Sequence, residues 1–190
     1  MKVIEKYKNE IENATKEGRK IIACMCNNEV KSLNYEVNEI DNIELLDTSS
    51  KDGHRIYIRG ILYIMAKALN EVYPEALLSV NYQLSSAMFC KIDNMEITDE
   101  MIANVKARMQ EIINQNLEIR KVVMTKEEAE EFYSNEKTLR GIVQIDNTQK
   151  EGVSLYYCED YFNYFFGVMP VTTASVSYTH LRAHETDSYL

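Results

Sequence analysis

The sequence lacks the glycine-rich motifs with which many enzymes bind phosphates. Neither GxxxxGK[ST] nor GxGxxG occurs, and the 190 residues include only six glycines. Such loops use glycine because the backbone must approach the phosphate closely. A GxSxG nucleophile elbow is also absent from the sequence. We therefore predict no catalytic and no cofactor-binding residue in this chain.

Positive charge and long hydrophobic runs are scarce as well. The formal net charge is −9, so the chain as a whole does not attract nucleic acid. A local basic patch is still compatible with this net charge. No run approaches the roughly 20 apolar residues of a membrane span. The charged N-terminal stretch has no signal-peptide hydrophobic region. We expect a cytoplasmic protein with no membrane contact and no binding to nucleic acid.

Cysteine and histidine are few, and their placement gives one candidate metal pair. The four cysteines form no CxxC motif and are expected to be buried, reduced thiols. His54 stands at the expected start of a helix, where a capping or surface role is favoured over catalysis. His180 and His184 have the four-residue spacing of a zinc-binding pair on a helix. Whether they form a site depends on whether this C-terminal stretch is native.

Two further clusters are expected to be structural. The acidic residues of 127–131 fit a solvated helix face better than a metal cluster. The aromatic residues of 156–166 could stack on bases. No lysine or arginine lies among them, which favours packing in the core.

Hydrophobic periodicity predicts two units of mixed helix and strand, separated by a polar stretch at 48–53. The first unit should contain a helix at 3–17 and strands at 20–26, 30–37 and 43–47. In the second unit we expect a helix from His54 to Tyr73, followed by a hairpin of 76–84 and 87–93 and by a helix capped by Thr98. A strand at 117–124 should come next, and then a short helix opened by a capping box of Thr125 and Glu128. Two aromatic strands are expected within 153–167. Without a βαβ rhythm, the fold class is α+β.

The second unit resembles the second N-terminal domain of threonyl-tRNA synthetases, which alanyl-tRNA synthetases share and which edits mischarged tRNA. The similar stretches are "RGILYIMAKALNEVYPEALL", "ITDEMIANVKARMQEIINQNLEIRKVVMTKEEAEEFY" and "VSLYYCEDYFNYFFG". The preceding unit resembles part of the small β-grasp, or TGS, domain of those enzymes. The resemblance implies a partial β-grasp domain at 1–49 and an editing-domain-like domain of helices and antiparallel sheet at 50–174.

The residues that hold zinc in those synthetase domains are replaced in this sequence. The synthetases carry HxxxH on the first helix, and a Cys and a His near the end of the domain. Alignment puts Arg59 and Tyr63 at the first two positions, and Phe165 and Met169 at the last two. None of these side chains is a good zinc ligand, so we expect neither a metal site nor metal-dependent editing. A buried Arg59 would need an anionic partner, which makes a small acidic ligand of this altered pocket worth testing.

The chain also resembles bacterial nucleoside kinases of the uridine kinase-like family, in which the same two domains precede a P-loop phosphotransferase domain. The similar stretches are "LDTSSKDGHRIYIRGILY" and "YFNYFFGVMPVTT". This resemblance implies a non-catalytic N-terminal fragment of a nucleoside kinase, truncated and inactive alone, whose ATP and Mg²⁺ bind to the missing domain. The alternatives are a synthetase-derived tRNA-editing or tRNA-binding module and an interaction domain without a ligand. A homo-oligomer is compatible with each.

Both ends of the chain are expected to depart from the native gene product. A β-grasp domain opens with a hairpin before its helix, whereas Met1 is expected to lie in the helix already, as if the chain began inside the domain. At the other end, one reading frame of a transposase-type sequencing-library adapter encodes Val-Ser-Tyr-Thr-His-Leu-Arg-Ala-His-Glu, identical to 176–185. We therefore expect 175–190 to be adapter read-through, which removes His180 and His184 as a metal pair.

Overall fold

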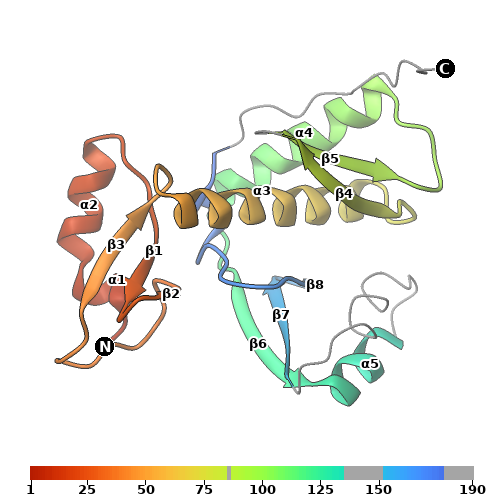
Figure 1. The fold of residues 1–190 in the computed structure, drawn as a ribbon. Helices are drawn as coiled ribbons and strands as arrows, with labels where there is room; N and C mark the ends of the chain where they lie inside the picture. Colours follow the sequence, from red (N-terminus) through yellow and green to blue (C-terminus); the bar gives the residue numbers. More distant parts are fainter. Residues whose placement is uncertain (85–86, 135–151, 178–190) are drawn as a thin grey trace.

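Three small antiparallel sheets surround one long helix, α3 (Lys51–Val72) (Figure 1). The structure is a computed structural model and describes residues 1–84, 87–134 and 152–177. Its mixture of helices with small antiparallel sheets confirms the α+β class. Within these ranges no helix is both long enough and apolar enough to cross a lipid bilayer.

The first unit is a three-stranded sheet with two short helices. Its elements are α1 (Val3–Lys6), α2 (Lys8–Lys16), β1 (Ile21–Cys26), β2 (Glu29–Lys31) and β3 (Ile43–Asp47). The apolar strand β1 lies between β2 and β3 and is almost wholly buried. Asn27 and Asn28 both have positive φ, at 49° and 67°. They form the tight two-residue turn that joins β1 to β2.

Two predictions for the first unit are corrected by the structure. The helix expected at 3–17 is interrupted at Tyr7, which has φ −107° and ψ 26°. The strand expected at 30–37 stops early because the residues after β2 pair with the start of the chain. The N–H of Val37, for example, donates to the carbonyl of Met1 at 3.0 Å. Met1 therefore lies in an extended contact and not in the helix, a pairing that local periodicity cannot reveal.

Helix α3 begins three residues earlier than expected. The hydroxyl oxygen of Ser50 accepts a hydrogen bond from the N–H of Gly53 at 3.1 Å and so caps the helix. His54 therefore lies inside the first turns and is exposed, so a surface position is confirmed and a capping role is wrong. The helix ends before Pro74, which cannot continue it.

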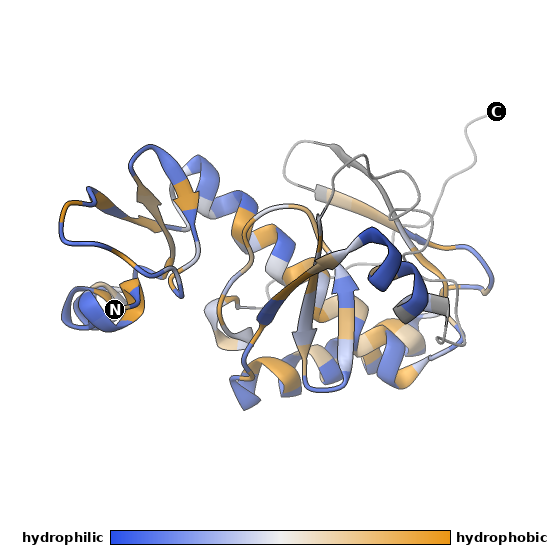
Figure 2. Ribbon diagram, turned by 90° about the horizontal axis from the view of Figure 1, so that it is seen from below, coloured by the Kyte–Doolittle hydropathy of each residue, from blue (hydrophilic) through white to orange (hydrophobic). Residues whose placement is uncertain are grey.

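A hairpin and a second long helix pack against α3. They are β4 (Leu78–Leu84), β5 (Ala87–Ile92) and α4 (Asp99–Gln115). The predicted cap of α4 is confirmed, because the Thr98 hydroxyl accepts from the N–H of Met101 at 3.1 Å. Hydrophobic and hydrophilic residues alternate along the central helix (Figure 2). Its hydrophobic side joins α4 in the largest core, which includes Ile64, Leu69, Met109 and Ile112.

The third sheet has one face toward α3 and the other toward a short helix. Its elements are β6 (Arg120–Thr125), α5 (Lys126–Ser134), β7 (Gly152–Cys158) and β8 (Tyr161–Tyr164), with strand order β6-β7-β8. Tyr156, Cys158 and Tyr161 pack with residues of α3, whereas Val153 and Leu155 pack with α5. The predicted capping box is present, since Thr125 and Glu128 exchange hydrogen bonds of 2.8 and 3.2 Å.

The chain returns past β6 to the large core after β8. The N–H of Ile119 donates to the carbonyl of Val171 at 2.8 Å, and the short 3-10 helix η1 (Thr173–Ser175) follows. Val176 is fully buried in the core shared by α3 and α4. His180 and His184 lie outside the described residues, so the adapter origin of 175–190 stays a prediction.

Candidate functional site

The four positions aligned with the synthetase metal ligands come together in the structure. Arg59 and Tyr63 lie one turn apart on α3, and Phe165 and Met169 lie in the segment after β8. The rings of Tyr63 and Phe165 meet edge to face, with centroids 5.8 Å apart. Met169 is 2% exposed and belongs to the same buried cluster. The alignment thus identified residues that are neighbours in space, although they are far apart in the sequence.

Tyr63 fills the centre of this cluster. Its side chain has no exposed surface. Its hydroxyl lies 3.0 Å from the carbonyl of Tyr156 and 3.3 Å from that of Tyr161, to which it can donate. Both carbonyls belong to the third sheet, so the phenol ties α3 to the ends of β7 and β8. A histidine that binds zinc needs an empty position for the metal beside its ring. At Tyr63 the phenol and its hydrogen bonds to backbone carbonyls fill that space.

Arg59 lies at the edge of the cluster, against the backbone that follows β8. Its Nη1 donates to the carbonyl of Val168 at 2.7 Å. Burial lowers the pKa of the guanidinium from its ordinary value. Gly167 has φ +99°, and a Cβ there would lie only 3.0 Å from the Arg59 Cζ. A carbonyl is thus the close partner of this arginine, and no carboxylate forms an ion pair with it among the described residues.

The hydroxyl of Tyr156 closes the same region from the sheet side. It donates to the carbonyl of Gly167. Burial raises the pKa of Tyr156 to about 12, although the nearby charge of Arg59 acts in the opposite direction. The phenol therefore stays neutral at physiological pH. Together with Tyr63, it fills this part of the site with hydrogen-bonded aromatic residues.

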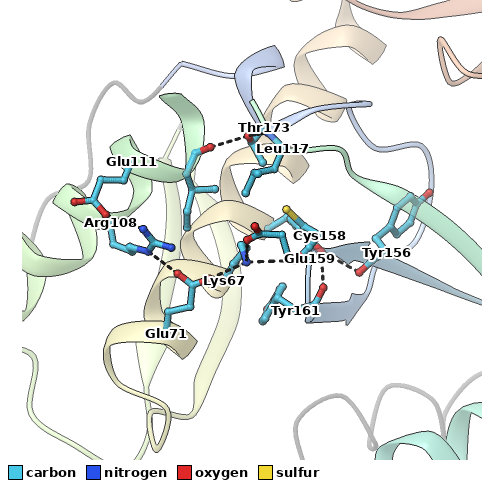
Figure 3. A network of polar contacts seen from close by, with 12 residues as sticks. Lys67, Glu71, Arg108, Glu111, Leu117, Tyr156, Cys158, Glu159, Tyr161 and Thr173 are labelled. Atoms are coloured by element: carbon cyan, nitrogen blue, oxygen red, sulfur yellow. Dashed lines mark hydrogen bonds and ion pairs between the residues drawn. The ribbon is translucent and has the colours of Figure 1, made fainter. Parts of the chain in front are cut away.

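A second group of polar residues, which sequence reasoning missed, lies beside the aromatic cluster (Figure 3). Lys67 on α3 is 2% exposed. Its ammonium lies 2.7 Å from Glu71, 3.2 Å from the Glu159 carboxylate and 3.3 Å from the carbonyl of Cys158. Arg108 on α4 bonds to the other oxygen of Glu71 at 2.5 Å. Only the spacing of Lys67 and Glu71 gave a sequence signal, because the other partners are distant in the chain.

Titration of this network is set by burial and by the opposite charges. Burial alone would lower the pKa of Lys67, but the hydrogen bond and charge of Glu71 outweigh it, and the pKa is raised. Burial would likewise raise the pKa of Glu71, yet the bonds from Lys67 and Arg108 win and lower it. The groups hold one another in their charged forms, as in a structural ion network and unlike a poised general base.

The cysteines and acidic residues do not assemble a metal centre in the described ranges. All four cysteines are free thiols; Cys24, Cys26 and Cys158 are buried, and Cys90 is half-buried. Burial raises the pKa of Cys24 and of Cys158 to about 11, which disfavours the reactive thiolate. Over residues 1–84, 87–134 and 152–177, no group of three or more His, Cys, Asp or Glu side chains could hold a metal ion.

Basic side chains line one side of the start of α3. Lys51, Arg55 and Arg59 recur every four residues, so they share one face of the helix. Lys51 and Arg55 are exposed, and Arg59 is half-buried. One carboxylate, that of Asp52, lies 3.5 Å from Arg55. The acidic chain therefore carries a local basic stripe that leads toward the aromatic cluster.

Comparison with known proteins relates the chain to threonyl-tRNA synthetases. No family model matches. A probable cytoplasmic threonine–tRNA ligase of Enterocytozoon bieneusi is 29% identical over 146 residues, which are 76% of this chain and 23% of that protein. The threonine–tRNA ligases of Clostridium kluyveri and Clostridium acetobutylicum are 23% and 26% identical over 140 and 145 residues. They cover 73% and 76% of this chain, and 22% and 23% of their own lengths.

These similarities show a synthetase-like domain. The chain spans about a quarter of the length of the curated relatives it matches. The relatives are consistent with an editing-domain-like fold, and they favour the synthetase-derived alternative over the kinase fragment that the motif resemblance led us to expect. They give no support to a nucleoside kinase.

Proposed function

We propose that this chain is a synthetase-derived, tRNA-binding module that has lost metal-dependent editing. The observation that carries the proposal is the buried position of Tyr63, at a place where the resembling domains have a metal-binding histidine. Phe165 and Met169 pack in the same cluster, Arg59 lies one turn before Tyr63 on α3, and all three are poorly suited to zinc. The similarity to threonine–tRNA ligases supports tRNA as the partner.

The geometry argues against hydrolysis at this site. A catalytic zinc keeps an open position for water beside its protein ligands. Here Tyr63 and Met169 are 0% and 2% exposed, and the phenol of Tyr63 is engaged with two backbone carbonyls. Water activation would also need a base with a suitable pKa. The Tyr156 phenol, with a pKa of about 12, is a poor candidate.

The basic stripe of α3 is the surface on which we place tRNA binding. Lys51 and Arg55 are exposed, and phosphate contacts depend on such side chains. Replacing both by Gln should weaken binding of a threonine-accepting tRNA by about tenfold at low salt and reduce its salt dependence. The matched control replaces Lys8 and Lys16 of α2 by Gln, which removes the same charge on a different unit.

Fluorescence anisotropy with labelled tRNA measures this binding. Equal affinity of the two double variants, or no binding by the unaltered chain at low salt, would contradict tRNA binding by α3. A separate assay follows deacylation of mischarged tRNA, for which we expect no turnover with or without added zinc. Zinc-stimulated deacylation by the unaltered chain would overturn the loss of editing chemistry.

A second candidate retains the nucleoside kinase. It is favoured by the tyrosine- and phenylalanine-rich stretch "YFNYFFGVMP" and by the loss of all four ligands, as the resemblance implies. On this proposal the whole protein phosphorylates a pyrimidine nucleoside with ATP and Mg²⁺, and this chain alone does not. Sequencing of the locus beyond codon 174 decides between the two. A GxxxxGK[ST] motif downstream would support the kinase, and class II synthetase motifs would exclude it.

A further inference from the structure

A pocket of about 200 Å³ lies on the third sheet, next to the aromatic cluster. Ser154 and Gly152 line it from β7. They point to the same side of the strand as Tyr156 and Cys158, because alternate residues share a face. Helix α3 covers Tyr156 and Cys158, whereas Ser154 is half-buried and Gly152 exposed. The pocket thus occupies the part of this face that α3 does not cover.

The charge of the pocket suits an anion. Lys121 of β6 is exposed and lines the pocket. It forms no ion pair within the described residues, whereas Lys31, Lys67 and Lys91 each contact a carboxylate. Among the residues that the structure describes, no aspartate or glutamate lines the pocket, although the chain has 30 acidic residues against 21 basic ones. An incoming anion would therefore meet an uncompensated positive charge.

Three aromatic residues, Tyr164, Phe165 and Phe166, also line the pocket. Phe165 lines it, and the contact with Tyr63 fixes the orientation of its ring. Phe166 also lines it and is 66% exposed, an unusual amount for a phenylalanine. Aromatic rings of this kind stack on planar groups. The volume lies below the roughly 300 Å³ at which sites for drug-sized ligands begin, so only a small molecule fits.

We propose that this pocket binds a small organic anion, consisting of a single planar ring and one carboxylate or phosphate group. Lys121 holds the anionic group, and the hydroxyl of Ser154 can hydrogen-bond to it. The side chains of Phe165 and Phe166 pack on the ring of the ligand. This ligand site goes beyond tRNA binding and does not depend on it. It shares Phe165 with the aromatic cluster, and Gly167, which also lines the pocket, lies beside the Arg59 guanidinium.

Titrations of the isotopically labelled 190-residue chain by NMR test this site. The probes are phenyl phosphate and benzoate, with inorganic phosphate, acetate and benzyl alcohol as controls that lack the ring or the charge. We expect a ring-bearing anion to shift the amide signals of Lys121, Ser154 and Gly167 together, at concentrations up to about 10 mM. Comparing phenyl phosphate with benzoate identifies the preferred acidic group.

Two lysine substitutions make the test specific. Lys121→Met should weaken binding of the preferred probe by about tenfold, which corresponds to about 1.4 kcal/mol. Lys121→Arg should retain binding, and so should Lys16→Met, which removes an exposed lysine from α2. The proposal is overturned if no ring-bearing anion shifts these signals, or if Lys121→Met binds as tightly as the unaltered chain. Because no probe contains RNA, this outcome is separate from the tRNA experiment.

Discussion

At the residue scale, Lys67 shows how a charge is accommodated inside this molecule. A buried ammonium is costly unless it is paired and hydrogen-bonded. Lys67 meets Glu71 on its own helix, Glu159 at the turn between β7 and β8, and a backbone carbonyl. Arg108 then adds α4 through Glu71. Lys67 thus connects α3 to the third sheet directly, and to α4 through Glu71 and Arg108.

Stability should depend on pH through this network. The pKa of Glu71 is lowered from 4.5. The stabilisation of the fold by ionised Glu71 is therefore present above the ordinary pKa of 4.5, and it is lost as the pH falls through the lowered pKa. The pKa of Lys67 is raised from 10.5, so its contribution is complete below that pH and is lost as the pH rises through the raised value. Between these limits the network stabilises the fold fully.

Glu71→Gln should lower the free energy of unfolding by about 2 kcal/mol at neutral pH, because two charged hydrogen bonds are lost. The difference from the unaltered chain should shrink as the pH falls below 4.5 and through the lowered pKa of Glu71, where Glu71 itself becomes protonated. Urea unfolding at a series of pH values measures both. Glu12→Gln, in the exposed pair with Lys8, is the control and should change little. A difference that stays constant into acid would contradict this assignment.

At the element scale, α3 organises the molecule, and its first turn is more constrained than its hydrophobic pattern indicates. The helix was predictable because Ile61, Met65 and Leu69 recur at the four-residue spacing of one helix face. Its start was not, because the polar stretch 48–53 looked like a linker. In the structure Ser50 caps the helix, and Gly53 packs against the end of β3. A Cβ on Gly53 would lie 1.9 Å from the carbonyl oxygen of Asp47.

Gly53→Ala should therefore destabilise the protein, opposite to the usual effect in a helix. Helix propensity alone favours alanine by about 1 kcal/mol. The overlap with Asp47 forces α3 and β3 apart, and we expect a net loss of about 1 to 3 kcal/mol. Thermal and urea unfolding measure the change. Lys51→Ala, at an exposed position in the same turn, should be nearly neutral. An increase in stability for Gly53→Ala would refute the close packing.

At the scale of the whole molecule, the units predicted from the sequence share a core. Ile22 and Leu46 of the first unit belong to the same buried cluster as Ile56 and Ile64 of α3. Val176, from the far end of the described chain, joins this cluster as well. The first unit also has a buried cluster of its own, which includes Val3, Ala14 and Leu33. The polar stretch 48–53 thus separates two sequence patterns whose buried residues meet at Ile22 and Leu46.

The buried position of Val176 can be tested by shortening the chain. A chain that ends at Ala174 should lose about 1 to 2 kcal/mol of unfolding free energy, because an apolar side chain leaves the core. A chain that ends at Ser177 keeps Val176 and is the matched control, with stability close to that of all 190 residues. Urea unfolding compares the three chains. Equal stability of the first and the last would show that Val176 contributes nothing to the core.

Local sequence patterns predicted most elements but not all of their limits. The hairpin of β4 and β5, the Thr98 cap and the capping box of Thr125 and Glu128 depend on residues a few positions apart, and each is present. The errors occurred where distant backbone competes for hydrogen bonds. The strand predicted at 30–37 stops at β2 because the following residues pair with the start of the chain.

The sequence by itself determined the α+β class, and its resemblance to synthetases singled out four positions at which that resemblance implies metal ligands and this chain has other residues. Side-chain chemistry alone makes Arg59, Tyr63, Phe165 and Met169 poor zinc ligands, so the absence of a metal site stays a prediction. Only the tertiary structure decided that these residues meet, that Tyr63 bonds to carbonyls of β7 and β8, and that Lys67 finds Glu159. Those partners lie more than 90 residues away in the sequence. Contacts at such separation depend on how α3 and the third sheet pack, which no local pattern encodes.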